Sequence, residues 1–253
     1  MRRHRLLSSL HQKLQPRNYL EIGVRNGYSL DLSRARTIAV DPAFSLTEEV
    51  HCDLHLVRTT SDEFFARKHP LAHFTEPVID LAFIDGMHLA EYALRDFINI
   101  ERFCRPGSVI VLDDVLPRSV EEGGRTRVGA ARAGAWTGDV YKTAQALRDH
   151  RPDLVVLEVN TLPTGTLVVL LPDHESRVLH RAYDDLVIEM VSPDPQDVPI
   201  WALERTRAVA PEVLLAANIW DAMPASRALA PSAARRHLGE LLASSGLDTR
   251  QVG

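Results

Sequence analysis

A chain of 253 residues, 45% hydrophobic and 25% charged, can bury one full core as a large α/β domain, alone or with a smaller appendage. Its net charge of -5 gives no overall attraction to nucleic acid, and no apolar run is long enough to cross a membrane, so neither partner is expected. The two cysteines, Cys52 and Cys104, lie far apart and form no CxxC motif, which disfavours a disulfide scaffold and predicts a cytoplasmic protein.

Short apolar runs alternate with helix-like periodicity along most of the chain, which predicts a mostly parallel sheet with helices on both faces. The expected strands are 19–24, 37–40, 54–57, 79–84, 108–112, 154–159 and 166–171. The expected helices are 5–14, 61–68, 89–103 and 140–150. Asn160, Pro163 and Gly165 leave no room for a helix between the last two strands, so these should form an antiparallel hairpin. The predicted fold class is α/β, with a Rossmann-like seven-stranded sheet.

The sequence pattern changes at residue 173, where helical patterns replace the alternation of strands and helices. A helical pattern over 174–191 is followed by a linker, "SPDPQDVP", and then by Ala-rich helices. We therefore divide the chain into a sheet domain with its N-terminal helix, 1–172, and a helical C-terminal extension, 173–253. This extension could be a lid, a cap or a dimerisation arm. Because an exposed apolar helical tail would tend to associate, a homo-oligomer formed through these helices is one expectation.

Two predicted core strands end in acidic residues. The run at 79–84 is followed by Asp85, and the run at 108–112 by Asp113 and Asp114. The carboxyl ends of parallel strands flank the crevice in which open α/β sheets bind ligands, so the three carboxylates should meet there. Their oxygens suit a hard divalent cation. In the alternative interpretation, Asp113 and Asp114 are turn residues and Asp85 is a helix cap or a cofactor contact.

The turns after the first three strands carry candidate residues for a ligand. Gly23 and Gly27 would let a ligand approach the backbone closely, and they also suit a tight turn. Glu21 suits a ligand with a positive charge. Asp41 is placed to accept hydrogen bonds from both hydroxyls of a ribose, or to cap a turn. Ser61 could contact an adenine edge or belong to a capping box that opens a helix.

The chain resembles class I S-adenosylmethionine-dependent methyltransferases in its closing hairpin and in five stretches: "YLEIGVRNGYSL", "IAVDP", "TSDEFF", "LAFIDGMHLAEYALRDF" and "RPGSVIVLDDV". Over residues 19–171 it most resembles the metal-dependent O-methyltransferases of the macrocin and novobiocin type, which act on sugars in antibiotic pathways. The resemblance implies Glu21, Gly23, Asp41 and Ser61 around the cofactor, a predicted site that we extend to Gly27, Ser29 and Asp85.

The resemblance also implies that Asp85, Asp113 and Asp114 bind magnesium, which would hold substrate oxygens and lower the pKa of the acceptor hydroxyl. Relatives often read Asp-Gly-Asp-His where this chain reads Asp85-Gly86-Met87-His88, and in some the second aspartate is the proposed base. Methionine cannot accept a proton. His88 is the best remaining base, and we predict that it is catalytic together with Asp85. The alternative is that His88 only hydrogen-bonds to the loop.

A long loop before the helix at 140–150 is expected to face the acceptor. Trp136 could stack on a sugar or an aromatic ring. Arginines of the loop could bind an anionic acceptor, namely Arg118, Arg125, Arg127 and Arg132. The alternative is a solvated loop that Trp136 anchors.

Together these patterns predict an O-methyltransferase that uses S-adenosylmethionine, assisted by Mg²⁺, on a hydroxyl of a sugar or another natural product. Its partner would be a small-molecule acceptor, glycosylated or not. An NAD-dependent Rossmann oxidoreductase is the rival enzyme, disfavoured by the incomplete glycine pattern and by the antiparallel hairpin. A non-catalytic protein that binds S-adenosylmethionine or a partner is the third alternative, which Met87 keeps open.

Overall fold

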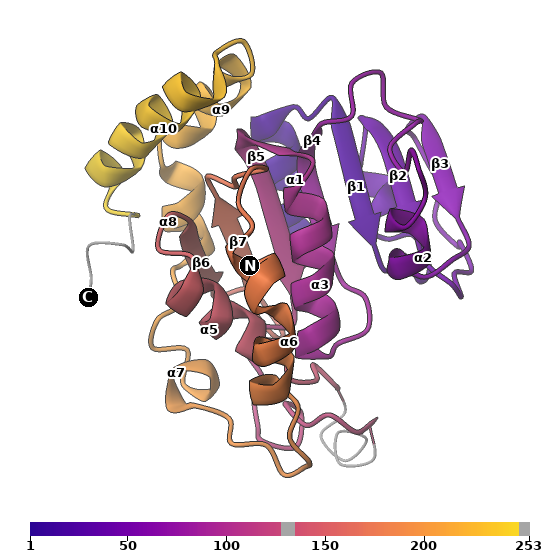
Figure 1. Ribbon diagram of the computed structural model, residues 1–253, viewed down its shortest axis with the longest axis vertical. Coiled ribbons are helices and arrows are strands. Elements are labelled where there is room, and N and C mark those ends of the chain that lie inside the picture. Colours follow the sequence, from indigo (N-terminus) through magenta and orange to yellow (C-terminus); the bar gives the residue numbers. More distant parts are fainter. Residues whose placement is uncertain (128–134, 248–253) are drawn as a thin grey trace.

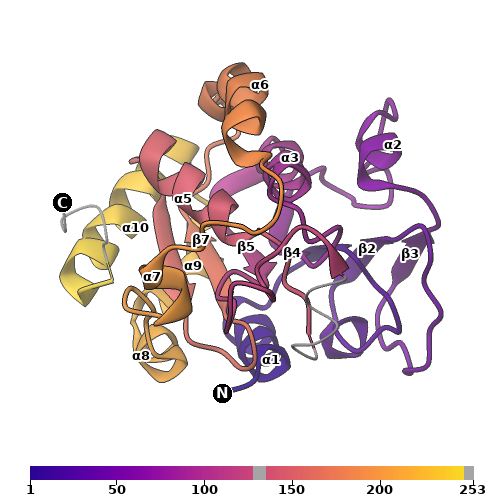
Figure 2. The same ribbon diagram turned by 90° about the horizontal axis from the view of Figure 1, so that it is seen from below.

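A central seven-stranded sheet lies between two layers of helices in the computed structural model, which describes residues 1–127 and 135–247 (Figures 1 and 2). The strand order is β3-β2-β1-β4-β5-β7-β6, and β7 runs antiparallel to both of its neighbours. The strands are β1 (Asn18–Ile22), β2 (Arg36–Val40), β3 (Leu54–Val57), β4 (Ile79–Ile84), β5 (Cys104–Asp113), β6 (Val155–Val159) and β7 (Thr166–Leu170). The predicted α/β sheet with its closing hairpin is confirmed.

Burial explains why the strands could be predicted from the sequence. Every residue of β1, β4, β6 and β7 is buried, because helices cover both faces of the sheet. Strands of this kind read as continuous apolar runs rather than as alternating patterns. Between β1 and β2 the chain forms only a short 3-10 helix, η1 (Leu30–Leu32).

Each helical layer buries its apolar side chains in a separate core cluster. One face of the sheet packs against α2 (Ser61–Phe65), α3 (Ala90–Glu101), α5 (Tyr141–His150), α6 (Val178–Met190) and α7 (Ile200–Leu203). The other face packs against α1 (Arg3–Leu14), α8 (Pro211–Ala216), α9 (Ile219–Ser226) and α10 (Pro231–Ser245). Figure 2 shows α3, α5 and α6 on one side of the sheet and α1, α8 and α9 on the other.

Helices after residue 173 contribute to both of these clusters. Trp220, Met223, Leu238 and Leu242 of α9 and α10 are buried in the same cluster as α1 and β5. These four side chains are therefore used within the chain, whereas Ile188, Ile200 and Val213 remain exposed. The homo-oligomer stays a prediction. The division of the chain at residue 172 also stays a prediction.

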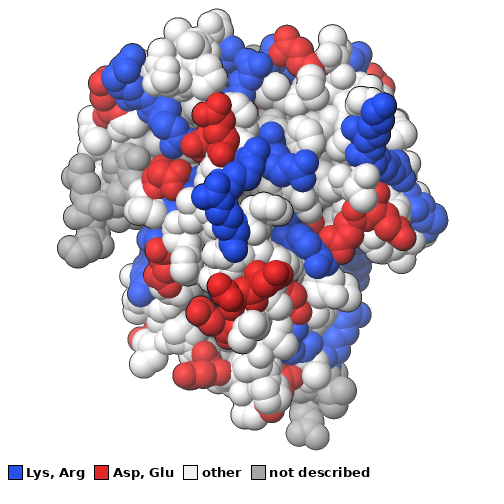
Figure 3. All heavy atoms as spheres, viewed as in Figure 1, with Lys and Arg blue, Asp and Glu red and all other residues white. Residues whose placement is uncertain are grey.

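Charged side chains of both signs are interspersed on the face that Figure 3 views. Among the helices of the described residues, none has the length and apolar character that crossing a membrane requires.

Candidate functional site

The carboxyl ends of the central strands open into a cleft of about 1410 Å³. This is the position at which open α/β sheets bind ligands. The lining includes the turn after β1, the residues that follow β2 and β4, and the start of α2. Arg3 and His4 of α1, Asp114 after β5, Trp136 and the tip of the β6–β7 hairpin complete it.

Gly23 brings the turn after β1 into direct contact with the end of β4. Its φ of +87° is one that side chains rarely permit, and a Cβ on it would lie 1.9 Å from the main-chain oxygen of Asp85. The Gly23 N–H donates to Val40 O at 2.9 Å, and the Asp85 N–H donates to Ile22 O at 2.8 Å. Only glycine fits here, so Gly23 packs the predicted cofactor turn against the acidic strand end.

Asp41 organises the same turn from the end of β2. Its Oδ2 accepts hydrogen bonds from the N–H groups of Val24 at 2.8 Å and Arg25 at 2.9 Å, and its Oδ1 accepts one from Ala43 N at 2.6 Å. Asp41 also lines the cleft. Its turn-stabilising role is therefore present, and its contact with a ribose stays a prediction.

Glu21 does not line the cleft, which corrects the predicted contact with a charged ligand. Its side chain is fully buried and accepts hydrogen bonds from Tyr19 Oη at 2.7 Å and Ser29 Oγ at 2.6 Å. Burial raises the pKa of Glu21 to about 8, against the lowering effect of these two hydrogen bonds. The carboxyl group is therefore mostly neutral at pH 7. Ser29 does line the cleft and lies between it and Glu21.

The start of α2 supplies the third part of the predicted cofactor site. Thr60 and Glu63 form the capping box that we expected as one alternative, with Glu63 N donating to Thr60 Oγ1 at 3.2 Å. Ser61 lines the cleft beside Asp96, a buried carboxyl of α3 that the sequence did not single out. Burial raises the pKa of Asp96 to about 7, although a hydrogen bond from Ser61 lowers it.

Asp85, His88 and Asp114 form the chemical centre of the cleft. His88 Nε2 lies 3.2 Å from Asp85 Oδ1, and His88 Nδ1 lies 3.1 Å from Asp114 Oδ2. One ligating atom from each of the three residues lies within 4.8 Å of the others. His88 and Asp114 have φ values of +58° and +63°, and such backbone strain in non-glycine residues concentrates at functional sites.

Asp113 pairs with Arg3 instead of joining this group, so the structure does not bring together the predicted three carboxylates. Its Oδ2 lies 2.6 Å from Arg3 Nη1, and His88 takes its place beside Asp85 and Asp114. Asp113 is the last residue of β5 whereas Asp114 turns away with positive φ, so the two side chains leave the strand in different directions. The Asp113 side chain is only 1% exposed, so its charge depends on Arg3 rather than on water.

Burial and mutual repulsion raise the pKa values of Asp113 and Asp114. Burial, with the charge of Asp85, raises the pKa of Asp114 to about 6, although His88, Thr164 and Arg3 lower it. Burial and the neighbouring charges of Asp114 and Asp85 hold the pKa of Asp113 well above its ordinary value. For His88, burial lowers the pKa, but the hydrogen bond to Asp85 and the charges of both aspartates outweigh it and raise the pKa.

The predicted acceptor residues divide into two groups. Trp136 and Arg127 line the cleft, and the Arg127 guanidinium lies 4.6 Å from the centre of the indole ring. Arg118 does not line it: this side chain, 48% exposed, pairs with Glu122, so its predicted substrate role is not supported. Arg125 pairs with Glu91 and the buried Asp139, and it does not line the cleft. Arg132 lies outside the described residues.

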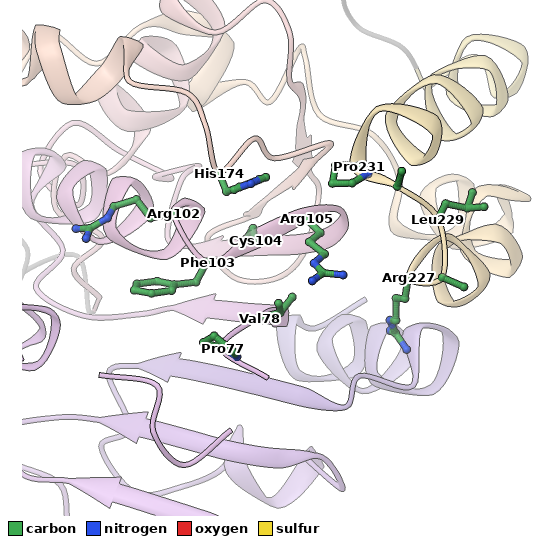
Figure 4. Close-up of a pocket in the computed structure, with 12 residues that line it drawn as sticks. Pro77, Val78, Arg102, Phe103, Cys104, Arg105, His174, Arg227, Leu229 and Pro231 are labelled. Carbon is green, nitrogen blue, oxygen red and sulfur yellow. The ribbon is translucent and has the colours of Figure 1, made fainter. Parts of the chain in front are cut away.

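A second cavity, of about 450 Å³, lies at the opposite edge of the sheet, where β4 and β5 begin. Figure 4 shows Arg105 and His174 near the start of α10, whereas Arg102 points away from Arg105 and Arg227. Its lining contains cationic side chains and no aspartate or glutamate. The cleft at the carboxyl ends is therefore the candidate site for chemistry.

Residues 20–115 match a family described as a methyltransferase domain. They contain the carboxyl ends of β1 to β5 and both acids of the cluster. This match assigns residues 20–115 to a methyltransferase domain. No curated protein matches the chain.

The chain is also similar to solved structures of O-methyltransferases. One of them, a putative caffeoyl-CoA O-methyltransferase from Staphylococcus aureus, has a TM-score of 0.50 and 17% identity, covering 66% of this chain and 82% of that one. The O-methyltransferase TomG from Streptomyces achromogenes, involved in tomaymycin synthesis and solved with its cofactor, has a TM-score of 0.49 and 20% identity over 66% and 78% of the two chains. An O-methyltransferase from Bacillus cereus has a TM-score of 0.45 and 16% identity over 66% and 80%.

Proposed function

We propose that the methyltransferase domain transfers the methyl group of S-adenosylmethionine to a hydroxyl oxygen of a small natural product, a sugar hydroxyl being the first candidate. One observation carries the proposal. Gly23, in the predicted cofactor turn, packs against the main chain of Asp85, so the cofactor turn and the Asp85–His88–Asp114 cluster lie in one cleft. A methyl donor bound at the turn and a hydroxyl acceptor bound at the cluster would lie close together, as methyl transfer requires.

The cofactor half of the cleft would use the residues around the first two strands. Gly23 allows a ligand to approach the main chain, and Asp41 offers carboxylate oxygens to the two ribose hydroxyls. Ser29 and Ser61 present hydroxyl groups on the same wall. Because Glu21 is buried behind Ser29, it would act on the cofactor through that hydroxyl and not by direct contact.

His88 would accept the proton of the acceptor hydroxyl. It lies between two carboxylates, which stabilise the imidazolium that forms when a proton arrives. The same carboxylates fix the orientation of the ring. Met87, although exposed at 57%, has no group that could compete for this role.

The cluster also fits the divalent cation that the resemblance implies. Two carboxylates and an imidazole converge within 4.8 Å of one another, and carboxylate oxygens are the ligands that a hard divalent cation prefers. Asp85 and Asp114 would hold the ion, with His88 remaining the base. A bound Mg²⁺ would orient the acceptor oxygen and lower the pKa of its hydroxyl.

Ligand binding and turnover test the proposal together. S-adenosylhomocysteine should raise the melting temperature, NAD should not, and Asp41→Ala should abolish the shift, whereas the exposed Glu49→Ala should keep it. Labelled S-adenosylmethionine with a panel of glycosylated and phenolic acceptors then tests turnover, with and without chelator. A shift with NAD alone would contradict the assignment, and full activity in excess chelator would remove the metal from the proposal.

A further inference from the structure

Arg3 places its guanidinium between the carboxylates that end β4 and β5. Its Nη1 lies 2.6 Å from Asp113 Oδ2, and its Nη2 lies 3.8 Å from Asp85 Oδ2. The Asp113 side chain is only 1% exposed, so water does not solvate its charge. A buried carboxylate without a partner is strongly unfavourable, so Arg3 supplies the charge compensation that Asp113 needs.

The backbone around Arg3 is held by the hairpin that also holds Asp114. Arg3 N donates to Leu162 O at 3.3 Å, and Leu162 N donates to Met1 O at 2.8 Å. Two residues further along the hairpin, the Thr164 hydroxyl donates to Asp114 Oδ1. The guanidinium and the carboxylate cluster are therefore positioned by one structural element.

The charge pattern of α1 supports a role for Arg3 outside its own helix. The helix begins with Arg3, His4 and Arg5 and has no acid in its first turn. The N-terminal end of a helix favours negative charge, so this pattern is locally unfavourable. For Arg3, the carboxylates of Asp113 and Asp85 offset that cost. Positions at which a sequence departs from such a local preference are often functional.

We propose that Arg3 is the internal counter-ion of this cluster and limits its affinity for divalent cations. Its guanidinium keeps Asp113 out of the ligand set and adds positive charge beside Asp85. When that charge is removed, Asp113 becomes available as a third carboxylate ligand, and cation affinity rises. This inference rests on the proposed function, in which Asp85 and Asp114 hold the ion.

Calorimetric titration of the full chain with MnCl₂ tests the inference without any methyl acceptor. Arg3→Met should bind Mn²⁺ at least about tenfold more tightly than the wild type, because a repelling charge is lost and a carboxylate is gained. Arg3→Lys keeps the charge and should remain close to the wild type. Arg5→Met removes one charge from an exposed position in the same helical turn and should change the affinity less than about twofold.

A double-mutant cycle with Asp113→Asn identifies the carboxylate involved. Arg3→Met combined with Asp113→Asn should bind Mn²⁺ no more tightly than Asp113→Asn alone. An Arg3→Met variant that binds like the wild type, or whose gain persists beside Asp113→Asn, would overturn the inference. If thermal melting shows that Arg3→Met is unfolded, Arg3→Gln, which keeps a hydrogen-bond donor, replaces it with the same expectations.

Titration with S-adenosylhomocysteine separates this inference from the proposed function. If the wild type does not bind S-adenosylhomocysteine, the methyltransferase proposal is contradicted. The comparison of Mn²⁺ affinity between the wild type and Arg3→Met still tests the inference in that case. Mn²⁺ that binds neither the wild type nor Arg3→Met, while S-adenosylhomocysteine still binds, would overturn the inference alone.

Discussion

The imidazole of His88 lies almost parallel to the indole of Trp136, with ring centroids 5.2 Å apart and an interplanar angle of 12°. His88 Nδ1 also lies 3.0 Å from the main-chain oxygen of Trp136. Trp136 thus supports the ring by its face and by its backbone, while Asp85 and Asp114 lie beside the two nitrogens. The indole that we expected to stack on a substrate is already packed against the candidate base.

Replacing Trp136 by leucine should lower kcat by about threefold to tenfold, because a stacked pair of rings contributes about 0.5–1.5 kcal/mol. Trp136→Phe keeps a ring and should lose less. Steady-state kinetics with an accepted hydroxyl substrate measures both variants, and S-adenosylhomocysteine affinity is the control that should not change. Equal losses in the two variants would mean that stacking is not the cause.

The rate should rise with pH through an inflection above 6.5, the ordinary pKa of histidine. The base must be neutral to accept a proton, and the hydrogen bond to Asp85 with the two aspartate charges raises the pKa of His88 in spite of burial. NMR titration of His88 in the free protein should give the same pKa as the kcat/KM profile. His88→Gln should lose this limb of the profile together with most of the activity. If the rate of His88→Gln still rises with pH through this inflection, a group other than His88 is responsible for it.

Gly23→Ala should abolish binding of S-adenosylhomocysteine and destabilise the fold, because its Cβ would collide with Asp85 O and its φ is +87°. Gly239→Ala is the matched control. A Cβ on Gly239 in α10 meets no atom within 4 Å, so this change should stabilise the protein by about 0.5–1 kcal/mol through helix propensity. Chemical denaturation and a thermal shift with ligand measure both effects. Unchanged ligand binding in Gly23→Ala would place the cofactor elsewhere.

The fold was predictable because buried parallel strands are continuous apolar runs in the sequence, whereas the segments between them are not. The expected and observed strands differ mainly at β5, which begins at Cys104, four residues earlier than expected. Its first residues include Arg105, Pro106 and Gly107, which do not read as a strand. Only Cys104 pairs at this end, opposite Ile79 at the start of β4, and the register shifts before Val109 pairs with Leu81.

The composition of the acidic cluster was only partly predictable. Position at a strand end correctly indicated that Asp85 and Asp114 would lie together, since strand order determines it. The separation of Asp114 from Asp113 involves the positive φ of Asp114, and the partner of Asp113, Arg3, lies 110 positions earlier in the sequence. Neither follows from periodicity or spacing, because both are set by tertiary packing.

Glu21 should make the folded state less stable as the pH rises. Burial raises its pKa to about 8 in the folded protein, from an ordinary value of 4.5. Between pH 4.5 and 8 the folded state therefore holds a proton that the unfolded state has released. By linkage, the contribution of Glu21 to the free energy of unfolding is largest below pH 4.5 and falls as the pH rises through 8.

Glu21→Gln should remove this dependence, because the amide does not titrate and can still hydrogen-bond to Tyr19 and Ser29. Between pH 5 and pH 9, the wild type should lose more unfolding free energy than the variant, by an amount on the order of 1–3 kcal/mol. Urea denaturation at both pH values measures the difference. Glu49→Gln, at an exposed position, is the control and should follow the wild type. If Glu21→Gln loses as much unfolding free energy as the wild type, Glu21 is ionised in the folded protein at neutral pH. The cofactor site would then contain a negative charge behind Ser29.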